Sequence, residues 1–157
     1  MTGRQPSGGC QCGAVRFTCS GLGRASICHC RMCQKAFGSF FGPLVTARDL
    51  RWTRGSPSWF ASSNKVRRGF CKACGTPLAY DWGGGVEVAI GALDEPERAA
   101  PAIQVNPGER LSFFAALHEL PVRPEAEREA AARFMAGIVG NQHPDRDTEA
   151  WPQESGE

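Results

Sequence analysis

The chain has 157 residues, of which 41% are hydrophobic and 22% are charged, and its formal net charge is +2. Such a composition is typical of one globular domain and argues against intrinsic disorder or a fibrous repeat. The sequence shows no apolar run with the length of a signal peptide or a membrane helix, so we expect a cytoplasmic protein without a membrane partner.

Residues 8–121 are predicted to be mainly β, because short strand-like runs alternate with glycine and proline and no long helical period interrupts them. Val15, Phe17 and Cys19 alternate with polar residues, which is typical of a strand with one buried face. Gly83 to Gly85 indicate a hairpin turn. Further strands are predicted at residues 43–46, 58–62, 66–70, 77–82, 86–93, 102–105 and 111–116.

One α-helix is predicted over residues 124–139, with Pro124 at its first position and Gly140 as its stop. An apolar stripe at helical spacing predicts a face that docks on the sheet; it consists of Ala131, Phe134, Met135 and Ile138. Residues 141–157 are polar and acidic, with Trp151 as their only large apolar residue. We therefore expect a domain over residues 1–140 that includes the helix, followed by a mobile polar tail at 141–157.

The eight cysteines are unevenly distributed, since all but Cys19 stand in close groups. In a reducing cytosol, grouped cysteines indicate metal ligands rather than disulfides. Zinc prefers about four soft ligands in a tetrahedron, and two cysteines one or two residues apart can bind the same ion. The groups are Cys10 with Cys12, Cys28 with Cys30 and Cys33, and Cys71 with Cys74.

These seven cysteines divide into four plus three. Cys28, Cys30 and Cys33 occupy three corners of one tetrahedron, which leaves the other four to complete a second site. A full shell of four cysteines is typical of structural zinc, whereas three protein ligands leave a corner open for chemistry. We therefore predict two zinc ions, one closed and one open. Loaded in this way, the chain would carry a net charge near −1 instead of +2, and we expect no nucleic-acid partner.

Two alternatives stay open at this stage. The cysteines could form disulfides, or both zinc ions could be structural, with His29 as the fourth ligand of the second ion. His29 could also serve as a proton shuttle or as a hydrogen-bond partner behind the ligands. Cys19, on the apolar face of the first strand, is predicted to be a small buried hydrophobic residue.

Four blocks of the sequence resemble the glutathione-dependent formaldehyde-activating enzyme family, which shares its Mss4-like, or β-tent, zinc fold with the centromere protein V group. The blocks are residues 8–16 (GGCQCGAVR), 28–35 (CHCRMCQK), 62–78 with RGFCKACGTPL at its end, and 91–96 (GALDEP). The segment before Leu120 and Pro121 departs from the family's closing strand, and the C-terminal extension is longer than the family pattern.

The resemblance implies a mainly β zinc fold. In it, Cys10, Cys12, Cys71 and Cys74 would hold a structural ion, and Cys28, Cys30 and Cys33 would hold the catalytic one. It also implies a carbon-sulfur lyase that joins formaldehyde to glutathione as S-hydroxymethylglutathione, or that handles a related thiol adduct. The open zinc would take the substrate sulfur as a thiolate.

Glutathione carries two carboxylates, and the cationic side chains near the predicted open site are candidates to bind them. These candidates are Arg31, Lys35, Arg67 and Arg68. A rival interpretation is a zinc module without catalysis that binds a protein or a small thiol. The sequence gives no oligomeric state.

Overall fold

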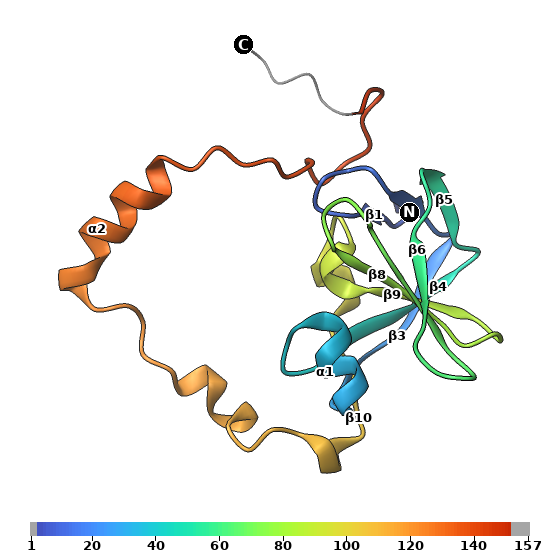
Figure 1. Cartoon of the computed structure of the whole chain (residues 1–157), viewed down its shortest axis with the longest axis horizontal. Helices are drawn as coiled ribbons and strands as arrows, with labels where there is room; N and C mark the ends of the chain where they lie inside the picture. Colours follow the sequence, from blue (N-terminus) through green and yellow to red (C-terminus); the bar gives the residue numbers. More distant parts are fainter. Residues whose placement is uncertain (1–2, 152–157) are drawn as a thin grey trace.

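The fold was analysed in a computed structural model of the chain, which describes residues 3–151. The described chain forms two β-sheets, two α-helices and several short 3-10 turns (Figure 1). The α-helices are α1 (Arg31–Phe37) and α2 (Glu125–Ala136). The strands are β1 (Ser7–Gly9), β2 (Arg16–Thr18), β3 (Gly21–Cys28), β4 (Gly42–Arg48), β5 (Arg51–Arg54), β6 (Ser58–Ala61), β7 (Arg67–Phe70), β8 (Pro77–Asp81), β9 (Val86–Ala89) and β10 (Ile103–Val105).

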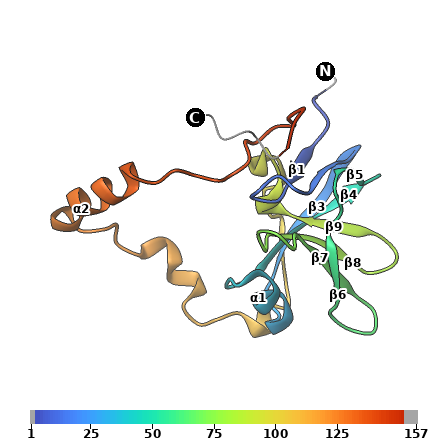
Figure 2. The same ribbon diagram turned by 45° about the horizontal axis from the view of Figure 1, so that its top comes forward.

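The larger sheet has seven strands in the order β10-β3-β4-β9-β8-β7-β6, and the smaller sheet has the order β1-β2-β5. All neighbours are antiparallel except β10, which runs parallel to β3. The core contains the fully buried Phe17, Val45, Leu78 and Val88. Phe17 of the small sheet also meets Trp52 edge to face, with ring centroids 5.8 Å apart. Figures 1 and 2 show α1 lying beside the end of the large sheet.

The predicted fold class, mainly β with a C-terminal helix, is confirmed. Six predicted strands correspond to β2, β4, β6, β7, β8 and β10, and the glycine turn joins β8 to β9 with Gly83 at a φ of 84°. The strand predicted at 86–93 stops at Ala89, where a 3-10 turn (Ile90–Ala92) begins. Cys19 is buried, as predicted.

Four elements of the body were missed, namely β1, β3, β5 and α1, and one prediction was wrong. β3 is glycine-rich and has no clear alternation, and its pairing with β4 and β10 defines it. Helix α1 has seven residues, too few for a helical period to be visible in the sequence. The strand predicted at 111–116 is instead a turn leading into the 3-10 segment η4 (Phe114–Glu119), whose N–H groups bond three residues back.

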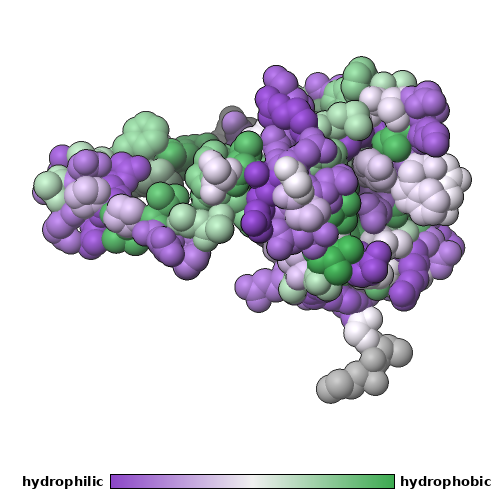
Figure 3. Space-filling view, turned by 90° about the horizontal axis from the view of Figure 1, so that it is seen from below, coloured by the Kyte–Doolittle hydropathy of each residue, from purple (hydrophilic) through white to green (hydrophobic). Residues whose placement is uncertain are grey.

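The helix predicted at 124–139 forms, but it ends at Ala136, with Gly137 rather than Gly140 after it. The prediction that its apolar stripe docks on the sheet is wrong. No residue of α2 is buried, and Phe134 is 72% exposed. Figures 1 and 2 show α2 on a long arc that stands away from the sheets, and Figure 3 shows it as a separate lobe of mixed polarity.

Neither α-helix in the described range is long and apolar enough to cross a membrane.

Candidate metal centres

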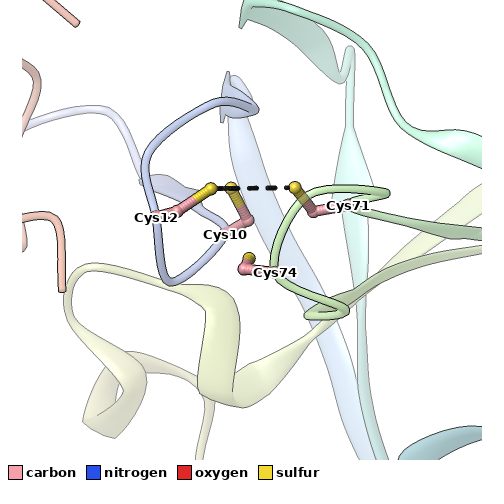
Figure 4. Close-up of side chains that lie close together, drawn as sticks. All are labelled: Cys10, Cys12, Cys71 and Cys74. Carbon is pink, nitrogen blue, oxygen red and sulfur yellow. Dashed lines mark hydrogen bonds between the residues drawn. The ribbon is translucent and has the colours of Figure 1, made fainter. Parts of the chain in front are cut away.

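The first cysteine cluster is formed by two tight loops, one after β1 and one between β7 and β8. The sulfurs of Cys10, Cys12, Cys71 and Cys74 all lie within 4.8 Å of one another (Figure 4). The Cys10 and Cys12 sulfurs are 3.6 Å apart, and those of Cys12 and Cys71 are 3.9 Å apart. A tetrahedral zinc with Zn–S bonds of about 2.3 Å separates its sulfurs by about 3.8 Å, so this donor set fits the ion.

Backbone hydrogen bonds within the protein shape the loop that carries Cys71 and Cys74. The Cys71 N–H donates to the Thr76 carbonyl at 3.0 Å, and the Gly75 N–H donates to the Cys71 carbonyl at 2.8 Å. Gly75 has a φ of 78°, which only glycine adopts without strain. The two loops are joined directly, because the Gln11 N–H donates to the Thr76 hydroxyl at 3.0 Å.

Thr76 also favours the thiolate form of one ligand. Burial raises the pKa of Cys74, but the Thr76 hydroxyl and N–H and the Cys12 backbone outweigh it and bring the pKa to about 6. A thiol that loses its proton so readily is prepared for metal binding.

A buried ion pair holds the first loop against the rest of the body. Arg16 is 3% exposed and binds both carboxylate oxygens of Asp94, at 2.8 and 2.7 Å. The Ser7 hydroxyl also donates to Asp94, at 2.6 Å. Burial alone would raise the pKa of Asp94, but these hydrogen bonds and the Arg16 charge lower it. The residues of the GALDEP block therefore support the strand that leads to Cys10.

The segment predicted to be a mobile tail contacts this same region in its described part. The His143 N–H donates to the Gln11 carbonyl at 2.7 Å, and the His143 ring lies against Gly13, where a Cβ atom would come within 2.2 Å. Arg16 also binds Asp147, and Arg54 donates to the Thr148 carbonyl. The mobility of the tail stays a prediction, whereas these contacts place residues 143–148 over the first cluster.

The second cluster comes from one short stretch of chain. Cys28 ends β3, Cys30 is the N-cap of α1, and Cys33 lies in the first turn of that helix. Their three sulfurs lie within 4.8 Å of one another, which again fits a tetrahedral zinc. The Cys30 sulfur accepts a hydrogen bond from the Cys33 N–H at 3.4 Å, so the helix start itself orients two ligands.

Arg68 is a buried charged residue that hydrogen-bonds to a sulfur of this cluster. Its guanidinium donates to the Cys33 sulfur at 3.3 Å and to the Ser62 hydroxyl at 3.0 Å, and it lies 5.0 Å over the Tyr80 ring. Burial raises the pKa of the Cys33 thiol to about 12, and the Arg68 charge opposes that rise. Arg68 therefore favours the thiolate that a metal requires.

A cavity of about 780 Å³ opens beside this cluster. All three cysteines of the second cluster line this cavity, and none of the other four metal-ligand candidates does. Of those four, Cys10 lines a smaller hollow of about 200 Å³. The other polar residues of its wall are Arg24, Ser26, Thr46, Arg68, Tyr80, Glu87, Asn106 and Glu109. The open position of a three-ligand metal would thus have room for a small molecule next to it.

The four cations predicted to bind substrate lie in different places. Arg68 lines the cavity, whereas Arg31 and Lys35 line an adjoining apolar hollow of about 380 Å³ that α1 forms with Phe60 and Ser62, and Arg68 lines this hollow too. Arg67 pairs with Asp81 at 2.7 Å and stacks on Trp59. A role for any of these four cations in substrate binding stays a prediction.

His29 is fully buried and does not line the cavity. Its Nε2 lies 2.9 Å from the Gln104 side-chain oxygen, and its ring packs against Phe114 and Phe41. It is not in either group of potential ligands among residues 3–151. Its contacts instead link the junction between β3 and α1 to β10 and η4, and β10 forms part of the cavity wall. All eight cysteines are free, so the disulfide alternative finds no support.

Sequence reasoning missed Arg24, Tyr80, Glu87, Asn106 and Glu109. One signal was available, since Glu87 is a single acid between the apolar residues of β9. Asn106 has a φ of 52° and its amide lies 3.5 Å from the Cys28 sulfur, which no sequence pattern indicates.

Comparison with known proteins agrees with the arrangement of two cysteine clusters in a β fold. A sequence model of the family described as glutathione-dependent formaldehyde-activating enzyme matches residues 5–107. The chain belongs to this family. The family match contains all seven grouped cysteines and ends before η4 and α2.

The fold of the chain also resembles a crystal structure of a Rhodobacter sphaeroides protein. The two are 22% identical with a TM-score of 0.50, over 63% of this chain and 99% of that chain. At this level of identity the likeness concerns the fold alone, which is consistent with the Mss4-like fold predicted from the sequence.

Proposed function

We propose that the chain is a zinc-dependent carbon-sulfur lyase that joins formaldehyde to glutathione or handles a related adduct of a thiol with an aldehyde. The observation that carries this proposal is the asymmetry of the two clusters. Three sulfurs lie at the wall of a cavity of about 780 Å³, while the four-sulfur set lies outside it. Family membership supports the same reaction class.

Cys28, Cys30 and Cys33 would hold the zinc, and such an ion offers an open position that accepts a thiol sulfur and lowers its pKa. Three thiolates give the site excess negative charge, and the buried Arg68 offsets it beside Cys33. The cavity wall holds the thiol and the aldehyde together, which converts an encounter of two molecules into a local event.

The bond changes balance without an oxidant or reductant. The substrate sulfur donates an electron pair to the aldehyde carbon, the π pair of the C=O bond moves to oxygen, and oxygen takes up the proton that the thiol released. Tyr80 lines the cavity, and burial raises the pKa of its hydroxyl. It would therefore remain protonated at neutral pH and could donate its proton to this oxygen, taking up in return the proton that the thiol released.

The test is titration calorimetry of the zinc-loaded protein with glutathione and with S-methylglutathione. The methylated compound keeps both carboxylates but cannot form a thiolate, so it should bind much more weakly. Binding of glutathione should also strengthen as the pH rises toward the thiol pKa of about 8.5, because ligation releases a proton.

A rate assay completes this test. Wild-type protein should accelerate adduct formation over a zinc-free blank, and Cys30→Ser should not. Equal affinity for the two glutathione compounds, without acceleration, would contradict the lyase proposal and favour a non-catalytic binding module.

A further inference from the structure

The cavity beside the three cysteines extends along one face of the large sheet as a row of polar residues. Arg68, Tyr80, Glu87 and Thr46 are direct partners on the adjacent strands β7, β8, β9 and β4. All four line the cavity. Neighbouring strands are about 4.8 Å apart, so the backbones of Arg68 and Glu87 are separated by roughly 10 Å.

Arg24 lies on the other side of Thr46. It stands on β3 at the register shift between Leu22 and Ala25, and the adjacent Gly23 lies so close to Thr46 that a Cβ there would come within 2.8 Å of it. Arg24 and Glu87 therefore flank Thr46 at the end of the cavity farthest along β3 from Cys28. Arg24 lies four positions before Cys28, which is roughly 13 Å of strand.

Glu87 has no structural partner that explains it. Its carboxylate makes no side-chain hydrogen bond or ion pair within residues 3–151, although it is half-buried in an otherwise apolar strand. Burial raises its pKa, and the charge of Arg24 partly opposes this. The carboxylate is only partly desolvated because it faces the cavity, and partly buried charged groups of this kind gather where a ligand supplies a partner.

We propose that Glu87 binds an ammonium group of the thiol substrate and that Arg24 binds the carboxylate beside it, so that this end of the cavity reads an amino-acid head group. The inference rests on the proposed function, because it places the substrate sulfur at the three-cysteine cluster. The roughly 13 Å of strand is shortened by the reach of the Cys28 and Arg24 side chains into the cavity, so a tripeptide-sized thiol of roughly 10 Å can span it. The cavity then selects its thiol by charge as well as by sulfur.

The experiment compares glutathione with N-acetylglutathione, which keeps the thiol but lacks the ammonium group, by calorimetry on zinc-loaded protein. Wild type should bind glutathione about tenfold or more tightly than the acetylated compound, as expected for a charged hydrogen bond. Glu87→Gln should reduce this preference to about twofold or less. Glu97→Gln, a change of the same kind at an exposed position with no cavity contact, should retain the full preference.

The outcomes separate this inference from the proposed function. Equal binding of glutathione and N-acetylglutathione by wild type, with S-methylglutathione much weaker, would overturn the role of Glu87 and leave the thiol-binding metal in place. A preference that survives in Glu87→Gln would also overturn it. Equal binding of S-methylglutathione, or no binding of glutathione, would overturn the proposed function itself. The comparison of ligands on wild type can overturn the inference even if the variant does not fold.

Discussion

The two cysteine clusters contain the same chemistry in opposite structural settings. The first joins segments that are far apart in the chain, since Cys12 and Cys71 are separated by 59 positions. The second comes from a single β3–α1 junction. A metal that joins distant segments contributes its binding free energy to folding, whereas a metal held by a local turn is free to serve a ligand. The large cavity lies beside the second cluster and not beside the first.

The largest effect is expected when the first metal centre loses a ligand. Cys71→Ser should leave little folded protein, because the metal that joins the two loops would lose a ligand and with it a large part of the roughly 10 kcal/mol that such a site can supply. Cys30→Ser should remain folded and contain one zinc per chain instead of two. Solubility, circular dichroism and elemental analysis of both variants measure the difference, and Cys19→Ala serves as a control at a buried cysteine outside both clusters. Equal loss of folding in both ligand variants would contradict the division.

The second prediction concerns the ion pair behind the first centre. Asp94→Asn should reduce the free energy of unfolding by about 3–5 kcal/mol, because it leaves the guanidinium of Arg16 buried without its main partner. Asp147→Asn removes the exposed partner of the same guanidinium and should cost less than about 1 kcal/mol. Chemical denaturation of the zinc-loaded variants measures both values. Similar losses of unfolding free energy in the two variants would show that burial does not make Asp94 the stronger partner of Arg16.

The same pair predicts a pH dependence. The pKa of Asp94 is lowered in the folded chain, so its contribution is fully present above the unfolded value of about 3.9 and is lost as the pH falls through the lower folded value. Stability of the wild type should therefore decline in acid more steeply than that of Asp94→Asn. Parallel pH profiles for the two proteins would contradict this assignment.

A smaller effect is expected at the second centre. Arg68→Gln should weaken zinc binding there by about 10–100-fold, because the Arg68 guanidinium donates a hydrogen bond to the Cys33 sulfur. The melting temperature should change little. Competition with a zinc chelator, read as the second zinc released, measures the effect, and Arg67→Gln on the same strand is the matched control. Unchanged zinc retention in Arg68→Gln would exclude the proposed support.

The two cysteine clusters could be predicted from the sequence, because the spacing of ligands along the chain is a local property. Each predicted group of cysteines is brought together, and the predicted fold class and most strands are confirmed. The cavity wall could not be predicted, since Tyr80, Glu87 and Thr46 become neighbours only through the pairing of β8, β9 and β4. The docking of α2 was predicted wrongly because periodicity identifies an apolar face but not what covers it.

The smallest expected effect concerns α2, which contacts neither centre. Phe134→Ala should change the free energy of unfolding by about 0.5 kcal/mol or less, because Phe134 is 72% exposed and truncation removes no core contact. Phe17→Ala, the same substitution at a fully buried position, should cost about 3–5 kcal/mol. Denaturation of both variants at a low protein concentration measures the contrast. A loss of several kcal/mol in Phe134→Ala would mean that α2 packs on the body in solution and would restore the docking that the apolar stripe predicted. A loss that appears only as the protein concentration rises would instead indicate that a second copy covers the stripe, because stability gained from association depends on concentration.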